Sequence, residues 1–252
     1  MTNALEKPSE AIARVEPDIT ALIKRHQSAF DRMLPPEMRG GAFTAIVFDV
    51  LRTTPKLCAP GLAHQVLAAC YAAAKLGLAP NTAQQLCWIV PPFGRNPVQL
   101  WLGAQGVRTM AMRSDPRILN IYGRVAHEND TFRVVEGTSP SIEHIPVHGD
   151  DCGDTMAAYA VAAYRDGHTA FEVVWGRDLD KISQNAMASK GSPDASPWSQ
   201  WYDRMAIKTA IKRLCKGLSL PLLVSEAIER DSKQETDDAA DLVSMMQGEI
   251  GE

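Results

Sequence analysis

The stretch TMAAYAVAAYRDGHTAFEVVW, residues 155–175, is the most informative part of the chain for the fold class. Thr155 to Arg165 and His168 to Trp175 each have the pattern of a strand. Asp166-Gly167 lies between them, and this dipeptide is the strongest short-range signal for a two-residue hairpin turn. We therefore expect an antiparallel β-hairpin here.

Two further pairs of strands are expected on the N-terminal side of this hairpin. Leu86 to Val90 and Val98 to Leu102 flank a loop of Pro, Gly and Asn residues. Ile118 to Ala126 and Thr131 to Val135 form the second pair. Alternating apolar residues bounded by turn residues are typical of such strands.

Helical periodicity marks most of the remaining chain. Gly77 stands at the expected C-cap of the clearest helix, while Ser196 and Pro197 suit the N-cap and first position of another. The expected helices cover residues 18–33, 43–51, 62–76, 104–113, 178–188 and 197–214. Strands and helices in this order predict an α+β fold, in which a small antiparallel β-sheet with hairpins packs against several helices.

Length and composition limit the class of protein. The chain has 252 residues, 45% of them hydrophobic, enough for one large domain or two small ones. No segment reaches the roughly 18 consecutive apolar residues of a membrane span, and the N-terminus lacks the apolar core of a secretion signal. Five scattered cysteines suit a reducing compartment. We expect a cytoplasmic protein with no membrane partner.

Charge is distributed unevenly along the chain. Its 26 Lys and Arg and 30 Asp and Glu give a net charge of −4, which alone argues against a polyanionic partner. Residues 225–252 nevertheless carry −7, so the rest carries +3, and residues 50–114 contain no acid. We expect a helical arm suited to oligomerisation at residues 1–38, a DNA-binding core at 39–224 and an acidic, disordered tail at 225–252.

The last expected helix carries a row of cations. At 100° per residue, Arg204, Lys208, Lys212 and Lys216 share one face, and apolar residues such as Ile211 share the opposite face. A solvated helix face is the ordinary explanation, but such a face usually includes acids one turn away, and a single acid lies near this row. The pattern therefore favours a face that follows the phosphates of a nucleic acid.

A second basic group precedes the strand expected at 118–126. Arginine binds phosphate through two hydrogen bonds and also stacks on bases, so this group suits a single strand, although salt bridges within the fold are the alternative. A loop lysine and a further helix arginine complete the set. The predicted DNA-binding residues are Arg108, Arg113, Arg117, Lys190, Arg204, Lys208, Lys212, Arg213 and Lys216.

Signatures of covalent catalysis are missing from the sequence. It contains neither Gly-x-x-x-x-Gly-Lys-Ser/Thr nor Gly-x-Ser-x-Gly. Glu172 is placed as in restriction-type nucleases, but Val174 stands where their lysine would be. His144 and His148 precede the acid-rich residues 150–154, yet a proline separates the two histidines, which favours a solvated linker over a zinc site.

We therefore expect no enzyme, no catalytic residue and no metal site. A metal-assisted nuclease is one alternative. An interaction protein whose basic helix docks onto an acidic protein partner is the other.

Ordered segments over residues 43–221 resemble the RecT family of phage and prophage single-strand annealing proteins. The segments are Leu76-Gly-Leu-Ala-Pro80, Gln99-Leu-Trp-Leu-Gly103 with Gly106, Arg113 and Ser114, residues 125–132, Ala158-Tyr-Ala-Val161, Phe171-Glu-Val173, and Pro197-Trp198 leading to Met205-Ala206, Lys208-Thr209 and Lys212-Arg-Leu214. Each segment is short, but their order and spacing are specific. Members of the family more often carry Gly-Tyr where Ala104-Gln105 stands.

The resemblance implies an ATP-independent protein that coats single-stranded DNA, anneals complementary strands in phage-type homologous recombination and assembles into rings or helical filaments. The implied partners are single-stranded DNA, the annealed duplex and further copies of the chain, in a bacterial cell or phage-infected host. No cofactor is expected to be required, and Mg²⁺ stays open as a modulator of DNA binding. The acidic tail is expected to compete with DNA for the basic groove, or to recruit a host single-strand binding protein or a phage exonuclease.

Overall fold

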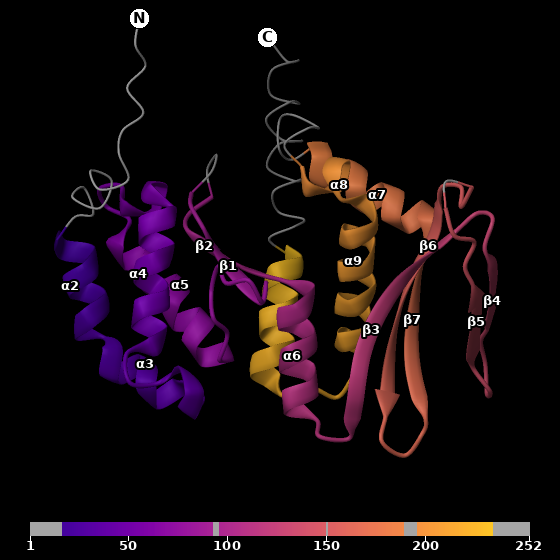
Figure 1. The fold of residues 1–252 in the computed structure, drawn as a ribbon, viewed down its shortest axis with the longest axis horizontal. Helices are drawn as coiled ribbons and strands as arrows, with labels where there is room; N and C mark the ends of the chain where they lie inside the picture. Colours follow the sequence, from indigo (N-terminus) through magenta and orange to yellow (C-terminus); the bar gives the residue numbers. More distant parts are fainter. Residues whose placement is uncertain (1–16, 93–95, 150, 189–195, 234–252) are drawn as a thin grey trace, which may run out of the picture. The chain divides into compact units, whose positions relative to one another are not determined.

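The computed structural model describes residues 17–92, 96–149, 151–188 and 196–233 (Figure 1). The chain forms two compact units, Met1–Gly106 and Val107–Glu252. Helix α6 (Ala104–Ser114) begins in the first unit and continues into the second. The division between the units falls inside the core expected at residues 39–224.

Helices build most of the first unit around an aromatic centre. They are α2 (Pro17–Arg25), α3 (Gln27–Met33), α4 (Ala42–Thr53) and α5 (Ala63–Leu76), with 3-10 turns at Pro36–Met38 and Pro55–Cys58. The buried ring of Phe30 lies 5.4 Å from that of Phe43 and 4.9 Å from that of Tyr71, measured between ring centroids. Aromatic packing of this kind joins α3, α4 and α5.

The end of α5 confirms the predicted C-cap. Gly77 adopts a left-handed conformation with φ of 62°. Its N–H donates to the Ala74 carbonyl at 3.0 Å, and the Leu78 N–H donates to the Ala73 carbonyl at 3.0 Å. These two bonds satisfy carbonyls that the helix would otherwise leave without a donor.

The single helix expected at 18–33 is instead two helices. The chain departs from helical geometry at His26, which precedes α3 with φ −92° and ψ 2°. The His26 ring Nδ1 lies 2.6 Å from the Tyr71 hydroxyl of α5. This tertiary hydrogen bond accompanies the break, and periodicity alone does not reveal it.

Strands β1 (Cys87–Val90) and β2 (Gln99–Leu102) pair antiparallel as predicted, with Cys87 opposite Leu102. The chain then passes very close to its own backbone. A Cβ atom at Gly103 would lie 2.1 Å from the Gln85 carbonyl oxygen, and one at Gly106 would lie 2.0 Å from that of Leu86. Glycine is therefore needed at both positions for the turn from β2 into α6.

The second unit is built on an antiparallel sheet with strand order β3-β6-β7. Its strands are β3 (Ile118–His127), β6 (Thr155–Tyr164) and β7 (Thr169–Trp175). The predicted hairpin joins β6 to β7, with Ala163 opposite Thr169 and Gly167 at φ 90°. Residues 157–162 of the central strand β6 are all buried.

Helix α9 (Tyr202–Gly217) packs across one face of this sheet and contacts all three strands (Figure 1). Small residues allow the close approach, since Gly123 of β3 lies opposite Ala160 of β6. A Cβ atom at Gly123 would lie 2.8 Å from the Ile207 Cγ2 atom of α9. The apolar face of α9 is buried against the sheet, as Ile211 shows.

The predicted pairing of Ile118–Ala126 with Thr131–Val135 is wrong. β3 pairs with β6, while β4 (Thr131–Val135) pairs with β5 (Ser141–Ile145), a segment expected to be loop. The lengths explain the outcome, because β3 and β6 have 10 residues each and β4 has 5. The β4–β5 hairpin contacts the sheet through Phe132, whose ring stacks on Tyr159 at 5.5 Å between centroids.

The C-terminal part of the second unit is more ordered than expected. Helices α7 (Gly176–Ala188) and α8 (Pro197–Gln200) precede α9, and the Ser196 hydroxyl caps α8 by accepting from the Trp198 N–H. A further helix spans residues 222–233, with Val224 and Ile228 buried four residues apart. Disorder from residue 225 onward is thus contradicted for residues 225–233, and residues 234–252 lie outside the described residues.

The α+β fold class is confirmed, with helices and small antiparallel sheets in one chain. In the part of the chain that the structure describes, no helix combines the length and apolar character of a membrane span.

Candidate nucleic-acid interface

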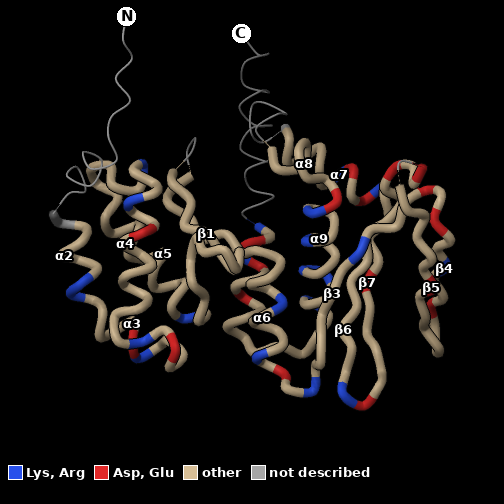
Figure 2. Tube along the Cα trace, in the orientation of Figure 1, with Lys and Arg blue, Asp and Glu red and all other residues tan. Residues whose placement is uncertain are grey.

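The cationic row predicted from the sequence lies along α9 (Figure 2). Arg204 is exposed near its N-terminal end and Lys216 at its C-terminal end. Lys208 is half-buried, while Lys212 has only 4% of its surface exposed. The exposure of the side chains therefore differs along the row. The interpretation of Lys212 as an open phosphate contact does not match its burial.

The helix at 222–233 supplies the acids that cover this row. The Lys212 Nζ donates to Asp231 Oδ2 at 2.8 Å, and the Lys208 Nζ lies 3.5 Å from the same oxygen. Asp231 is 3% exposed. The Lys216 Nζ pairs with Glu229 Oε2 at 2.9 Å closer to solvent, and its hydrogen bond holds the pKa of Glu229 below the usual value. The acidic neighbours that the α9 sequence lacks thus come from a later segment of the chain.

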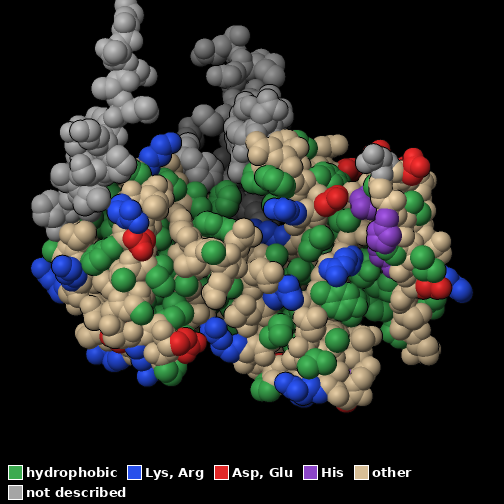
Figure 3. Space-filling model, viewed as in Figure 1, with side chains coloured by type: hydrophobic (Ala, Val, Ile, Leu, Met, Phe, Trp, Pro, Cys, Tyr) green, Lys and Arg blue, Asp and Glu red, His purple; other side chains and the backbone are tan. Residues whose placement is uncertain are grey.

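The N-terminal end of α9 presents an arginine on an aromatic ring. The Arg204 guanidinium lies 4.6 Å from the centroid of the Trp201 indole, and Trp201 is 51% exposed. Such a pair offers a cation for phosphate and a flat apolar surface for a base. Figure 3 shows Lys and Arg side chains at the surface of the second unit among hydrophobic ones.

A cavity of about 170 Å³ lies beside α9. Three consecutive cations of the C-terminal half of α9 line it, namely Lys212, Arg213 and Lys216. Asn185 of α7 and Thr209 of α9 add polar groups. Among the residues that the structure describes, no carboxylate lines this cavity, although the Arg213 Nη1 lies 3.4 Å from Asp178 Oδ2 beside it. Lys212 and Lys216 are likewise paired with Asp231 and Glu229, so an anion in this cavity would compete with these carboxylates.

The second basic group is not assembled as one patch. Arg108 and Arg113 of α6 are five residues apart, so they point about 140° apart around the helix. The exposed Arg117 donates from Nε and Nη2 to the two oxygens of Asp115 at 3.0 and 2.9 Å. These hydrogen bonds lower the pKa of Asp115. Arg117 thus forms a salt bridge within the fold, which was the alternative to DNA binding for this basic group.

Arg108 contacts the sheet. Its Nη2 donates to Asn120 Oδ1 of β3 at 3.2 Å. Arg113 is exposed on α6. Lys190 lies outside the described residues. The contacts of the predicted site residues therefore group Lys208, Lys212 and Lys216 with the helix at 222–233, and Arg108 with β3.

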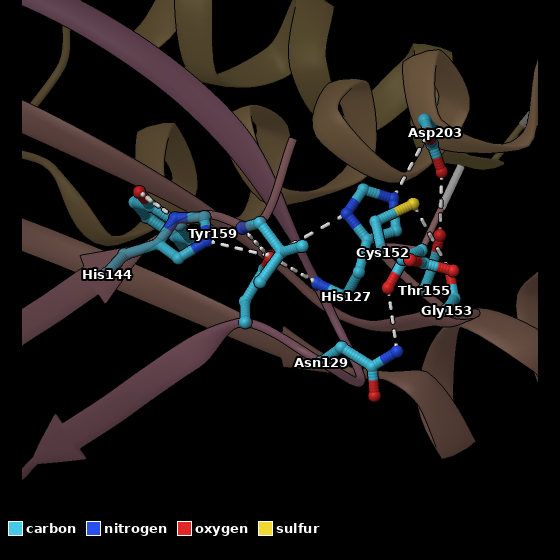
Figure 4. A network of polar contacts seen from close by, with 11 residues as sticks. His127, Asn129, His144, Cys152, Gly153, Thr155, Tyr159 and Asp203 are labelled. Carbon is cyan, nitrogen blue, oxygen red and sulfur yellow. Dashed lines mark hydrogen bonds and ion pairs between the residues drawn. The ribbon is translucent and has the colours of Figure 1, made fainter. Parts of the chain in front are cut away.

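A polar network connects the β4–β5 hairpin to the sheet (Figure 4). The buried Asp130 carboxylate accepts from the His127 N–H at 2.8 Å and the Val147 N–H at 2.7 Å, and its Oδ2 lies 3.0 Å from His144 Nε2. The His144 Nδ1 lies 2.9 Å from the Tyr159 hydroxyl. Burial opposes ionisation of Asp130, but these hydrogen bonds outweigh it and hold the pKa below the usual range.

This network contains His144, one of the two histidines considered as zinc ligands. His144 lies on β5 and bonds Asp130 and Tyr159. Across the described segments, no group of three or more His, Cys, Asp or Glu residues is arranged to hold a metal ion. The tertiary partners Asp130 and Tyr159 lie 14 and 15 residues away in the sequence, so the spacing of the histidines did not point to them.

Sequence reasoning also missed Arg124 of β3. It is exposed, and its guanidinium lies 5.8 Å from the ring centroid of Tyr122. The period-two alternation of a strand places both residues on one face with Asn120, and this alternation is the signal that could have found them.

The chain is similar to known proteins over most of its length. The model of the RecT family matches residues 41–243. Protein RecT of Escherichia coli (strain K12) is 32% identical over 182 residues, which are 69% of this chain and 65% of that protein. The match thus spans just under two thirds of that relative.

Proposed function

Because the chain belongs to the RecT family, as its ordered segments predicted, we propose that it binds single-stranded DNA and anneals complementary strands in homologous recombination. The observation that carries this proposal is the row of cations along α9, in which Arg204 is exposed beside Trp201 and Arg213 lines a cavity. Phosphates are the anions that a row of cations one helix turn apart suits best.

The proposed role needs no covalent catalyst and no ATP. Bound phosphates lose their mutual repulsion, and bases held in order can pair with a second strand. Arg204, Arg213 and Lys216 reach phosphates directly, because each is at least partly exposed. Lys208 and Lys212 reach them when a phosphate takes the place of Asp231. Lys190 and Arg113 are proposed as further contacts.

An annealing assay tests the proposal. Two complementary oligonucleotides carrying a donor and an acceptor dye are mixed at low nanomolar concentration, without ATP and with or without Mg²⁺. We expect the protein to accelerate the appearance of energy transfer in both conditions. A rate equal to that of the free strands, both here and in a repeat with ATP, would contradict the annealing role. Acceleration in the repeat alone would contradict the ATP-independent mechanism.

Assembly and protein partners are part of the same proposal. We propose that copies of the chain form rings or helical filaments on DNA, which electron micrographs with and without complementary strands would show. The acidic segment beyond residue 233 is proposed to compete with DNA, or to recruit a host single-strand binding protein or a phage exonuclease. Removing residues 234–252 leaves Asp231 in place, so a gain in DNA affinity supports competition and lost partner binding supports recruitment.

One observation favours a second candidate, a protein that docks an acidic helix onto its basic helix. The helix at 222–233 docks in this way on α9 within the chain. A variant chain that binds no single-stranded DNA but still captures an acidic helical peptide would favour that role over annealing.

A further inference from the structure

One face of the three-stranded sheet carries a polar and aromatic cluster apart from α9. Gly123 faces α9, as its close approach to Ile207 shows. Successive side chains of a strand point to opposite faces, so Tyr122 and Arg124 face away from α9. Arg124 lies opposite Tyr159 in the register with β6. This face therefore combines an exposed arginine with tyrosines on neighbouring strands.

A second guanidinium lies on this face. Arg108 of α6 donates to Asn120 of β3 at 3.2 Å, on the same side of the strand as Arg124. Burial lowers the pKa of Arg108, and the charge of Arg124 lowers it further, so an anion bound near both groups would favour their charged forms.

The hydrogen bonds of Arg124 leave room for such an anion. Its Nη1 donates to the Gly123 carbonyl at 3.0 Å, and its guanidinium lies beside the Tyr122 ring. Among the described residues, Arg124 forms no ion pair with a carboxylate. Arg124 is exposed, and a guanidinium can form a bidentate contact with phosphate.

The aromatic component selects among anions. Tyr122 is half-buried, and its ring lies beside the Arg124 guanidinium. Tyr159 beside it is already stacked on Phe132. A tyrosine ring beside a guanidinium suits a nucleotide, because the base can stack on the ring while the phosphate binds the cation. Inorganic phosphate would use the arginines alone.

We infer that Arg108, Tyr122 and Arg124 form a nucleotide subsite on the sheet face opposite α9, in which the two arginines hold one phosphate of a single strand and Tyr122 stacks on a base. The inference rests on the proposed binding of single-stranded DNA. It adds a second contact surface to that of α9, on the other side of the sheet.

Binding of two probes separates the contribution of the arginines to phosphate binding from that of Tyr122 to base stacking. Fluorescence anisotropy is measured with an oligothymidylate and with an abasic strand of equal length, which has phosphates but no bases. Arg124→Gln should weaken both probes about ten-fold. Tyr122→Leu should weaken the oligothymidylate about five-fold or more and leave the abasic strand unchanged. Tyr122→Phe should bind as the unchanged protein does.

A matched control and the contrary outcomes complete this test. Arg133→Gln changes an exposed arginine on β4 and should leave both affinities unchanged. If the unchanged protein binds neither probe, the proposed function fails. If it binds and Arg124→Gln and Tyr122→Leu bind equally well, the subsite is wrong and the proposed function stands. Equal losses on the abasic strand for both variants would reduce the subsite to an anion site.

A crosslinking experiment on the unaltered chain tests the subsite even if the variants fail to fold. A strand carrying 5-iododeoxyuridine is irradiated in complex with the protein, and the adducts are located by peptide mass spectrometry. We expect an adduct on Tyr122, because photochemical coupling requires a ring against the base. Adducts confined to other aromatic residues, such as Trp201, would overturn the assignment.

Discussion

Replacing Asp231 with asparagine is expected to lower the free energy of unfolding of the second unit by about 3 kcal/mol. The carboxylate is 3% exposed and accepts a 2.8 Å hydrogen bond from Lys212, which is 4% exposed. Lys208 lies 3.5 Å from the same oxygen. Removing one charge of a buried pair leaves the other charge in a poorly solvated place, which is why the expected effect is large. Urea unfolding followed by circular dichroism measures it.

Glu229→Gln is the matched control for this variant. The Lys216–Glu229 pair joins the same two helices, but its side chains are 40% and 51% exposed. Solvent screens such a pair, so the expected loss is much smaller than that of Asp231→Asn. Equal effects of the two substitutions would show that the helix at 222–233 is not held on α9 by the buried pair.

The same Asp231→Asn variant bears on DNA binding. If a phosphate takes the place of this carboxylate, removing the carboxylate should raise the affinity for single-stranded DNA at low salt. The comparison is made at a temperature where both proteins are folded. Unchanged affinity would place Lys208 and Lys212 outside the DNA-binding surface and leave their role structural.

Arg204→Glu combined with Arg213→Glu is expected to weaken single-strand binding by about a hundred-fold at moderate salt, about ten-fold for each position. Arg204 is exposed beside Trp201, and Arg213 lines the cavity next to α9. Both guanidiniums are accessible enough for the change to act on DNA more than on the core. Anisotropy titration with a labelled oligonucleotide measures the effect.

Lys56→Glu combined with Lys75→Glu makes the same change in net charge in the first unit, where both lysines are exposed. The control should retain most of the affinity. A similar loss in both double variants would show that binding follows the total charge of the protein and not a surface on α9. Unfolding curves of both variants are compared with that of the unchanged chain.

Local rules predicted the elements whose signals are local. The Asp166-Gly167 turn and the Gly77 cap depend on residues within a few positions of them. The pairing of β3 with β6 could not be predicted in this way, because strand partners are chosen by length and packing across the sheet. The helix at 222–233 was not predicted, because its acids are typical of a disordered tail. Val224 and Ile228 nevertheless provide the apolar face that docks it.

The candidate site shows the same limit. Charge periodicity placed these cations on one helix, and the structure has that helix as α9, but whether a lysine faces solvent depends on what packs over it. Asp231 lies 19 residues beyond Lys212, outside the range of any helical spacing rule. A Lys208→Glu and Lys212→Glu double variant, the natural test from sequence alone, would set new carboxylates against Asp231. Lost DNA binding in that variant would therefore also report lost folding.

The affinity of the unchanged protein for a labelled single strand, measured against salt concentration, tests the central claim most directly. A surface of cations that binds phosphates releases counterions, so the logarithm of the binding constant should fall linearly with the logarithm of salt concentration. The expected slope is about −0.7 for each phosphate contacted on a single strand. A slope of about −3 or steeper would agree with binding by the α9 cations. A flat response would contradict a phosphate-binding surface on this protein.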